Sequence, residues 1–385
     1  MGEHKVKMKQ KKYIFQLTKA ITNLEETAVT KMINSGADVD ATIIYSKTPL
    51  SYALEMGSEN IALLLLKSGA NPEKAAICEK SCHTLKPIHF ASQFNRKDFL
   101  SMLLKKNVDL EAKSSAGLCA LHYAASEGHI DICCDLIKYG ADVNGLDSYN
   151  RTPLHRAAEN GHCGVIELLV NSGAKPCVKD DLGNTPLLLA CYFSQLQAAK
   201  GLLNLCSNVN HSDTEGNSPL HVLCSPCQRN SESFTKSTYK HITTRRDIFQ
   251  RAQVFHVDEK LVDILISYGA FVEAVNKSGS SPFDCAKHYL NPDSQLVLLE
   301  KFVNAGLWVA NFSPETAFGP SFTYHVKESR AEFEEILSHL QKHQMKLKQQ
   351  CKSAIRKNIN FSGGKNVQYY VGYLPLPTQL KVFLQ

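Results

Sequence analysis

The sequence of 385 residues contains no apolar run of the roughly 20 residues that a membrane-spanning helix needs. The nearest candidate, residues 261–275, is interrupted by Asp263, Gly269 and Glu273. The charged opening MGEHKVKMKQKK is not followed by an apolar stretch, so the sequence does not predict a secretory signal. Val6 occupies the position at which a myristoylation signal has Ser or Thr. We therefore expect a soluble protein without a membrane partner.

The cysteine pattern and the missing catalytic motifs narrow the class of protein further. The 13 cysteines are odd in number and spread along the chain, which favours reduced thiols over disulfides. Reduced thiols are typical of the cytoplasm, where we expect the protein, or of the nucleus as the alternative compartment. Gly363-Gly364-Lys365 lacks the upstream glycine and the following Ser or Thr of a phosphate-binding loop. Metalloprotease, serine-hydrolase and kinase signatures are also missing from the sequence. We expect no catalytic residue, no metal and no cofactor.

One phrase recurs along the sequence with a period of 33 residues. TPLHRAAENGHCGVIELLVNSGAKP begins at Thr152, and a related phrase begins 33 residues later. Two intervals are longer, because 38 residues separate Thr48 from Lys86 and 63 separate Ser218 from Ser281. We predict about eight units over residues 12–310, with an insertion at residues 225–256. The phrase begins at Thr48, Lys86, Cys119, Thr152, Thr185, Ser218 and Ser281.

One copy of the phrase is enough to predict a pair of helices. Thr152 is a suitable helix N-cap, and Pro153 fits the first helical position, where a missing N–H costs nothing. Gly161 and Gly173 are placed to end the first and the second helix. Apolar residues at helical spacing mark a face on each helix that we expect to be buried. They are Leu154, Ala157 and Ala158 in the first helix and Val165, Ile166, Leu168 and Leu169 in the second.

The phrase and its period resemble the ankyrin repeat. The resemblance implies an all-α solenoid whose helix pairs stack, because one pair cannot bury its own apolar face, and whose concave surface binds other proteins. It also implies that the histidines at the fourth position of the phrase form hydrogen bonds that stabilise the turn. These histidines are His122, His155 and His221.

Three further features could be functional or merely structural. Cys224 and Cys227 form a C-x-x-C, and Cys78, Cys82 and His83 cluster before Lys86, but neither group has the second ligand pair that a zinc site needs. The insertion at residues 225–256 mixes hydroxyl, arginine and aromatic side chains, so it could be a partner contact, a phosphorylated switch or a tolerated surface loop. A lysine run opens the chain, and we expect residues 1–11 to be a solvated basic tail without a nucleic-acid partner. The lysines are Lys5, Lys7, Lys9, Lys11 and Lys12.

Two short patterns follow the repeats. After a linker and helix over residues 311–342, Leu347, Cys351, Ala354 and Ile355 make an apolar stripe on a helix rich in Lys and Gln. Such a stripe could simply cap the solenoid, or it could lie in the groove of a partner. An extended segment near residue 375 then displays leucines between prolines that lack backbone donors. Its residues are Leu374, Pro375, Leu376, Pro377 and, three positions later, Leu380.

In this order, after a repeat array, the two patterns resemble the SOCS box of the ankyrin repeat and SOCS box family. The resemblance implies a small helical SOCS box over residues 343–385. Leu347, Cys351, Ala354 and Ile355 would contact elongin C, which is joined by elongin B, and Lys346 departs from the small or proline residue that the family has before the leucine. The segment from Leu374 to Leu380 would contact cullin-5 with its RING subunit.

The resemblance implies a substrate receptor of a ubiquitin ligase, without catalysis of its own. The repeats would bind the protein to be ubiquitinated and degraded, and the box would recruit the ligase. The sequence does not identify that substrate or the residues that choose it. The alternative is an ankyrin scaffold or inhibitor with no link to a ligase, and an enzyme is the least favoured class.

Overall fold

The computed structural model describes residues 2–43, 47–78, 83–205, 208–225, 257–286, 292–305 and residue 338. The chain divides into two compact units. Unit 1 comprises residues 1–214 and 227–253, and unit 2 comprises residues 215–226 and 254–385.

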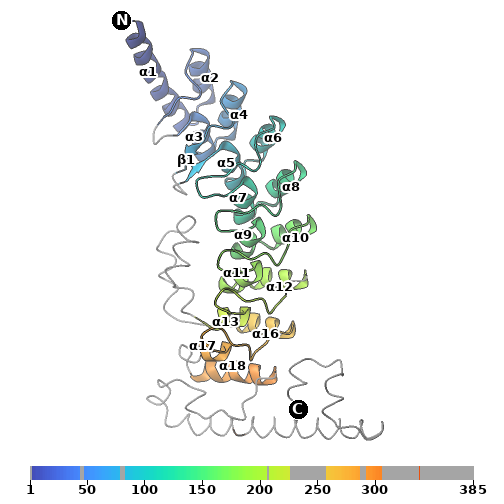
Figure 1. Cartoon of the computed structure of the whole chain (residues 1–385). Coiled ribbons are helices and arrows are strands. Elements are labelled where there is room, and N and C mark those ends of the chain that lie inside the picture. The colour runs from blue at the N-terminus through green and yellow to red at the C-terminus, as the bar shows by residue number, and fades with distance from the viewer. Residues whose placement is uncertain are drawn as a thin grey trace. The chain divides into compact units, whose positions relative to one another are not determined.

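Unit 1 is built from six consecutive helix pairs within its described residues (Figure 1). The first helices of successive pairs contact one another and form one row, and the second helices form a parallel row beside it. We call these the inner and the outer helices. The pairs are α1 (Gly2–Thr22) with α2 (Glu26–Asn34), α3 (Pro49–Glu55) with α4 (Glu59–Lys67), α5 (Pro87–Gln93) with α6 (Lys97–Lys105), α7 (Ala120–Glu127) with α8 (Ile130–Lys138), α9 (Pro153–Asn160) with α10 (Cys163–Asn171), and α11 (Pro186–Tyr192) with α12 (Leu196–Asn204).

The helix boundaries predicted from the repeated phrase are confirmed. Pro153 is the first residue of α9, with Thr152 as its N-cap, and Gly161 ends this helix in the left-handed conformation at a φ of 80°. Gly173 has a φ of 95° just after α10. A residue with a side chain adopts this conformation only with strain, so glycine at these positions sets where the helices stop.

The predicted apolar faces form the core of unit 1. Leu154, Ala157 and Ala158 of α9 are fully buried, and so are three of the four predicted residues of α10. Leu168 is half-buried. The alanines let α9 approach α7 and α11 closely, and apolar area removed from water between the pairs stabilises the stack at about 25 cal/mol per Å².

Two parts of unit 1 differ from the simple repeat. The additional residues before α5 form an antiparallel hairpin of strands β1 (Ala76–Ile77) and β2 (Thr84–Leu85), in which Ala76 pairs with Leu85. At the other end, the predicted boundary between a basic tail and the array, at residues 11 and 12, falls inside α1. Lysine is a good helix former, so the lysine run is compatible with one continuous helix.

Unit 2 contains α13 (Pro219–Cys224), α16 (Glu259–Ser267), α17 (Pro282–Ala286) and α18 (Pro292–Asn304). Helix α13 contacts α16 and α17, and α17 contacts α18. The insertion therefore separates the two helices of one repeat, α13 and α16. Helix α16 begins after Asp258, whose side chain accepts a hydrogen bond from the Leu261 N–H at 3.2 Å. Among the helices of the described residues, none is long and apolar enough to cross a membrane.

Candidate functional site

Every residue predicted to bind elongin or cullin lies outside the described residues. This holds for Leu347, Cys351, Ala354 and Ile355, and equally for the segment from Leu374 to Leu380. Cys82, Cys227, residues 226–256 and the linker and helix at residues 311–342, except residue 338, are outside them as well. The candidate site that can be built from described residues is therefore the repeat array itself.

Where the fourth position of the phrase is a histidine, that histidine links its helix to the following repeat. In α9, the backbone N–H of Thr152 donates to His155 Nδ1 at 3.0 Å, and His155 Nε2 lies 3.1 Å from the carbonyl oxygen of Asn184. Because Nδ1 accepts, Nε2 carries the proton and donates to the carbonyl. This confirms the hydrogen-bonding role that the repeat resemblance implies. The pairs are His89 with Ala112, His122 with Arg151 and His155 with Asn184 in unit 1, and His221 with Ser280 in unit 2.

The imidazoles of His89, His122 and His155 are neutral at pH 7. Burial lowers the pKa of His89, His122 and His155 to about 4, although the hydrogen bond to the carbonyl acts in the opposite direction. Both ring nitrogens are used within the protein, so none of these histidines has a nitrogen left to ligate a metal or transfer a proton. Within the described ranges, no group of three or more His, Cys, Asp or Glu side chains is arranged to hold a metal ion.

The low histidine pKa values predict that stability falls in mild acid. An imidazole with a pKa near 6.5 in the unfolded chain and about 4 in the folded chain contributes its full stability above pH 6.5, and this contribution decreases as the pH falls toward 4. Each of the three contributes a slope of up to about 1.4 kcal/mol per pH unit. Burial raises the pKa of Glu159, which acts in the opposite direction and offsets part of this slope.

Urea unfolding at pH 7 and pH 5 tests this prediction. We expect a lower free energy of unfolding at pH 5, and a smaller difference between the two pH values in the His122→Gln variant, which has one fewer imidazole to protonate. Equal free energies at both pH values would show that the histidines do not control the acid response.

A second set of hydrogen bonds runs back toward the preceding repeat. His129 Nε2 lies 3.1 Å from the Gln93 carbonyl oxygen, and His162 Nε2 lies 2.9 Å from that of Ser126. Gln195 takes the same role at the N-cap of α12, where its Nε2 donates to the Glu159 carbonyl at 3.2 Å. Sequence reasoning missed these contacts. The signal was the dipeptide Gly-His, which occurs at Gly128-His129 and again 33 residues later.

The inner helices differ from one another at the fifth position of the phrase. Arg156 occupies this position in α9, and it is the charged member of the set within unit 1. The other repeats carry apolar or aromatic residues there. They are Tyr52, Phe90, Tyr123 and Leu189.

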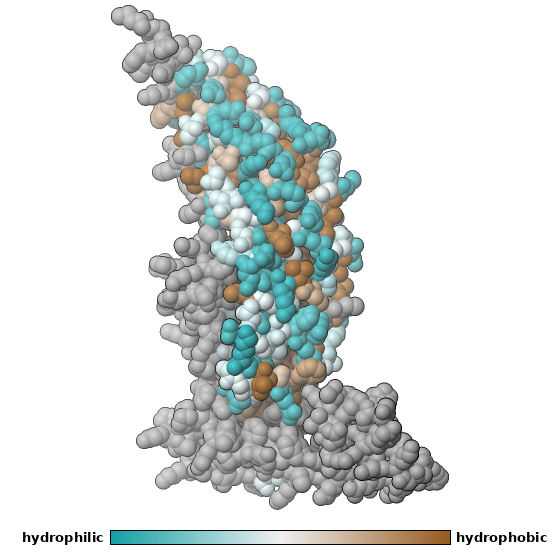
Figure 2. Space-filling view, viewed as in Figure 1, coloured by the Kyte–Doolittle hydropathy of each residue, from teal (hydrophilic) through white to brown (hydrophobic). Residues whose placement is uncertain are grey.

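The hydropathy of the surface also varies. Figure 2 shows hydrophilic residues over much of the described face, with apolar residues in separate small patches.

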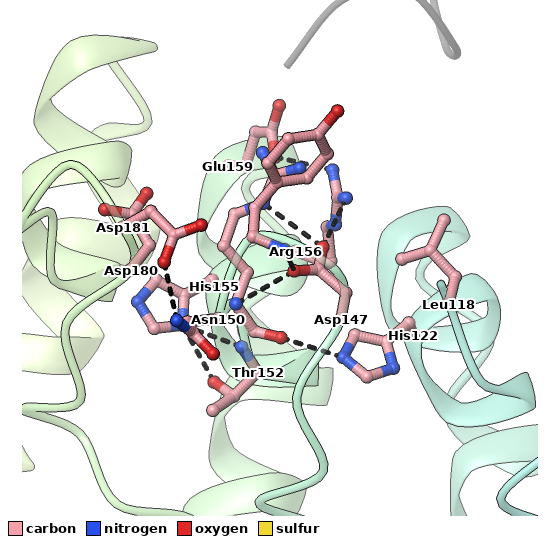
Figure 3. A network of polar contacts seen from close by, with 12 residues as sticks. Leu118, His122, Asp147, Asn150, Thr152, His155, Arg156, Glu159, Asp180 and Asp181 are labelled. Atoms are coloured by element: carbon pink, nitrogen blue, oxygen red, sulfur yellow. Dashed lines mark hydrogen bonds and ion pairs between the residues drawn. The ribbon is translucent and has the colours of Figure 1, made fainter. Parts of the chain in front are cut away.

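A buried charged cluster surrounds Arg156 (Figure 3). Arg156 Nη2 lies 2.7 Å from Asp147 Oδ2, and Arg156 Nη1 lies 3.4 Å from Glu159 Oε2. Arg151 Nε lies 3.2 Å from the same Asp147 oxygen. The other oxygen of Asp147 accepts the backbone N–H groups of Tyr149 and Arg151 at 2.8 and 2.9 Å. We call Asp147, Arg151, Arg156 and Glu159 the charged cluster.

The two carboxylates of the charged cluster are in different electrostatic states. Burial by itself would raise the pKa of Asp147, but the two guanidinium groups and the backbone donors outweigh it and hold the pKa below its usual value. Burial raises the pKa of Glu159, because the longer contact to Arg156 compensates it less. Asp147 is therefore the firmly ionised centre of the cluster, and it fixes the loop that contains it to α9.

The comparisons with known proteins agree with this geometry. A family model described as "Ankyrin repeats (3 copies)" matches residues 88–180 and 154–233, and a model described as "Ankyrin repeat" matches residues 45–76. The chain thus contains ankyrin repeats, and such repeats form a protein–protein interaction domain.

The chain was also compared with solved structures and with curated proteins. The chain is similar to the structure titled "Crystal structure of the ankyrin repeat domain of Bcl-3: a unique member of the IkappaB protein family", with 24% identity and a TM-score of 0.46. The similarity covers 61% of this chain and 97% of the other. No curated protein matches the sequence at a significant level.

Proposed function

We propose that this protein is a substrate-recognition subunit of a ubiquitin ligase that contains elongins B and C, cullin-5 and a RING subunit. The observation that supports the proposal is the order of three sequence features: an ankyrin array, then Leu347, Cys351 and Ile355 at intervals of four, then Leu374-Pro375-Leu376-Pro377 with Leu380. The array would bind the substrate, and the two C-terminal patterns would bind the ligase.

The physical basis of the proposal is the shape that each pattern can offer. A helix with anchors at i, i+4 and i+8 suits a hydrophobic groove, with Leu347 as the main anchor and Cys351 as a small apolar filler. The proline-bounded leucines suit a second, extended contact. The protein would have no active site of its own, and it would increase ubiquitin transfer by holding the substrate close to the catalytic subunits. The cytoplasm, or the nucleus, is the compartment that fits such a role.

A pull-down of the full-length protein with elongins B and C and cullin-5 tests the proposal. We expect the wild type to capture all three proteins and the Leu347→Ala, Cys351→Ala variant to capture none. The Leu374→Ala, Pro375→Ala variant should retain the elongins and lose cullin-5, because the two contacts are separate. Gln349→Ala with Gln350→Ala, between the anchors on the same predicted helix, is the matched control and should bind normally.

The alternative is an ankyrin scaffold that binds a partner without recruiting a ligase. It predicts that the wild-type protein captures neither elongin nor cullin. That result would remove the ligase proposal and leave the protein-binding role of the ankyrin repeats unchanged.

A further inference from the structure

Helix α1 carries most of the net charge of the protein. Its 21 residues contain six lysines and one glutamate, which gives +5 out of the +6 of the whole chain. It contains no arginine. The charge is therefore concentrated on one helix at the edge of unit 1.

One face of α1 packs against unit 1. Leu17 and Ile21 are fully buried and Ala20 is 5% exposed, where α1 contacts α2 and α3. The Gln10 side chain donates to the Gly36 carbonyl at 3.1 Å on this same side, since positions 10, 17 and 21 recur at helical spacing. The packing fixes the rotation of α1 about its axis.

The opposite face of α1 is cationic with an aromatic side chain at its centre. Phe15 is 72% exposed, the most exposed large hydrophobic residue among those described. Lys12 and Lys19 are also exposed, and they lie three residues before and four residues after Phe15 on the same side of the helix. We call Lys12, Phe15 and Lys19 the outer face of α1.

We propose that the outer face of α1 binds a membrane surface that carries anionic phospholipids. A helix that lies in the plane of a membrane places aromatic side chains at the boundary between headgroups and acyl chains and lysines on the phosphates. Phe15 is positioned for the first contact and the two lysines for the second. Lysine stems can cover the apolar boundary while their ammonium groups reach the headgroups.

The composition of α1 favours lipid over nucleic acid. Nucleic-acid recognition relies heavily on arginine, whose planar group binds phosphates and guanine in a bidentate manner. Lysine acts as a point charge and suits an anionic surface without a fixed geometry. This inference differs from the expectation of no membrane partner. That expectation rested on the absence of a membrane-spanning segment in the sequence. The exposure of Phe15 became visible only in the structure.

Co-sedimentation of the full chain with vesicles tests the proposal. We expect binding to vesicles of phosphatidylcholine with phosphatidylserine, little binding to phosphatidylcholine alone, and loss of binding at high salt. Phe15→Ala should weaken binding about tenfold. Lys12→Gln with Lys19→Gln should weaken it about 25-fold, at roughly fivefold for each lysine.

Two matched controls separate the outer face from general surface effects. Tyr139→Ala removes another exposed aromatic side chain, and Lys31→Gln with Lys67→Gln removes two other exposed lysines of unit 1. Both controls should bind vesicles as the wild type does. All altered side chains are exposed, so the far-ultraviolet circular dichroism and the thermal transition should be unchanged.

Three outcomes would overturn the proposal. The first is equal binding to neutral and anionic vesicles, or none to either. The second is that the protein binds a duplex RNA or DNA of matched charge more tightly than it binds anionic vesicles, and that Phe15→Ala does not weaken vesicle binding. The third is a concentration-dependent dimer that Phe15→Ala abolishes, because Phe15 would then be covered by a second copy of the chain.

Discussion

Replacing Asp147 with alanine is expected to lower the free energy of unfolding by about 3–5 kcal/mol. The change leaves the guanidinium groups of Arg151 and Arg156, which are 2% and 4% exposed as residues, without the carboxylate that they share. It also removes the acceptor of the Tyr149 and Arg151 N–H groups. The cost is therefore that of an uncompensated buried charge added to two lost hydrogen bonds. Equilibrium urea unfolding of the full chain measures it.

An exposed aspartate paired with a lysine provides the control. Asp131 lies 3.1 Å from Lys97 Nζ, and its side chain is 72% exposed. Asp131→Ala should cost no more than about 1 kcal/mol, because water screens this pair. Adding Arg156→Leu to Asp147→Ala should restore part of the lost stability, because it removes one of the two buried guanidinium groups that have lost the Asp147 carboxylate. If Asp147→Ala costs no more than Asp131→Ala, the charged cluster does not stabilise unit 1.

Replacing His155 with alanine is expected to cost about 3–5 kcal/mol. The imidazole is fully buried and joins the Thr152 N–H to the Asn184 carbonyl. Its removal leaves a buried donor and a buried acceptor without partners, and it opens a cavity between α9 and the next repeat. The loss should be located at one boundary, because each repeat contacts only its neighbours. Hydrogen exchange should therefore show faster exchange in α9 and α11 than in α3 and α4.

His211 provides the control for this prediction. It is half-buried in a loop of unit 1, outside the helices. His211→Ala should change the free energy of unfolding by less than about 1 kcal/mol. A loss of equal size in the two variants, or uniform exchange along unit 1 after His155→Ala, would contradict the structural role assigned to His155.

Much of the fold could be predicted because its signals are local. Thr152, Pro153 and Gly161 mark the two ends of α9 within ten residues, and the same phrase marks other inner helices. The buried residues followed from helical periodicity, with Leu168 as the half-buried exception.

The candidate site was less predictable. His129 and His162 were passed over, because a histidine before an outer helix has no partner in the neighbouring sequence. Arg156 is a charged residue at a position where the other repeats of unit 1 have apolar or aromatic residues. Its partner Asp147, however, lies nine residues earlier in a loop. The residues predicted to bind elongin and cullin lie outside the described residues, so their role remains a prediction.

The sequence alone determined the repeat period, the helix ends and the apolar faces, because capping, proline and glycine conformation and helical spacing act over a few residues. The tertiary structure decided which charges meet, which carbonyl each histidine reaches and that Phe15 faces solvent. These features depend on how one helix pair is placed against the next. That placement is fixed by packing between residues about one repeat apart, which no local pattern records.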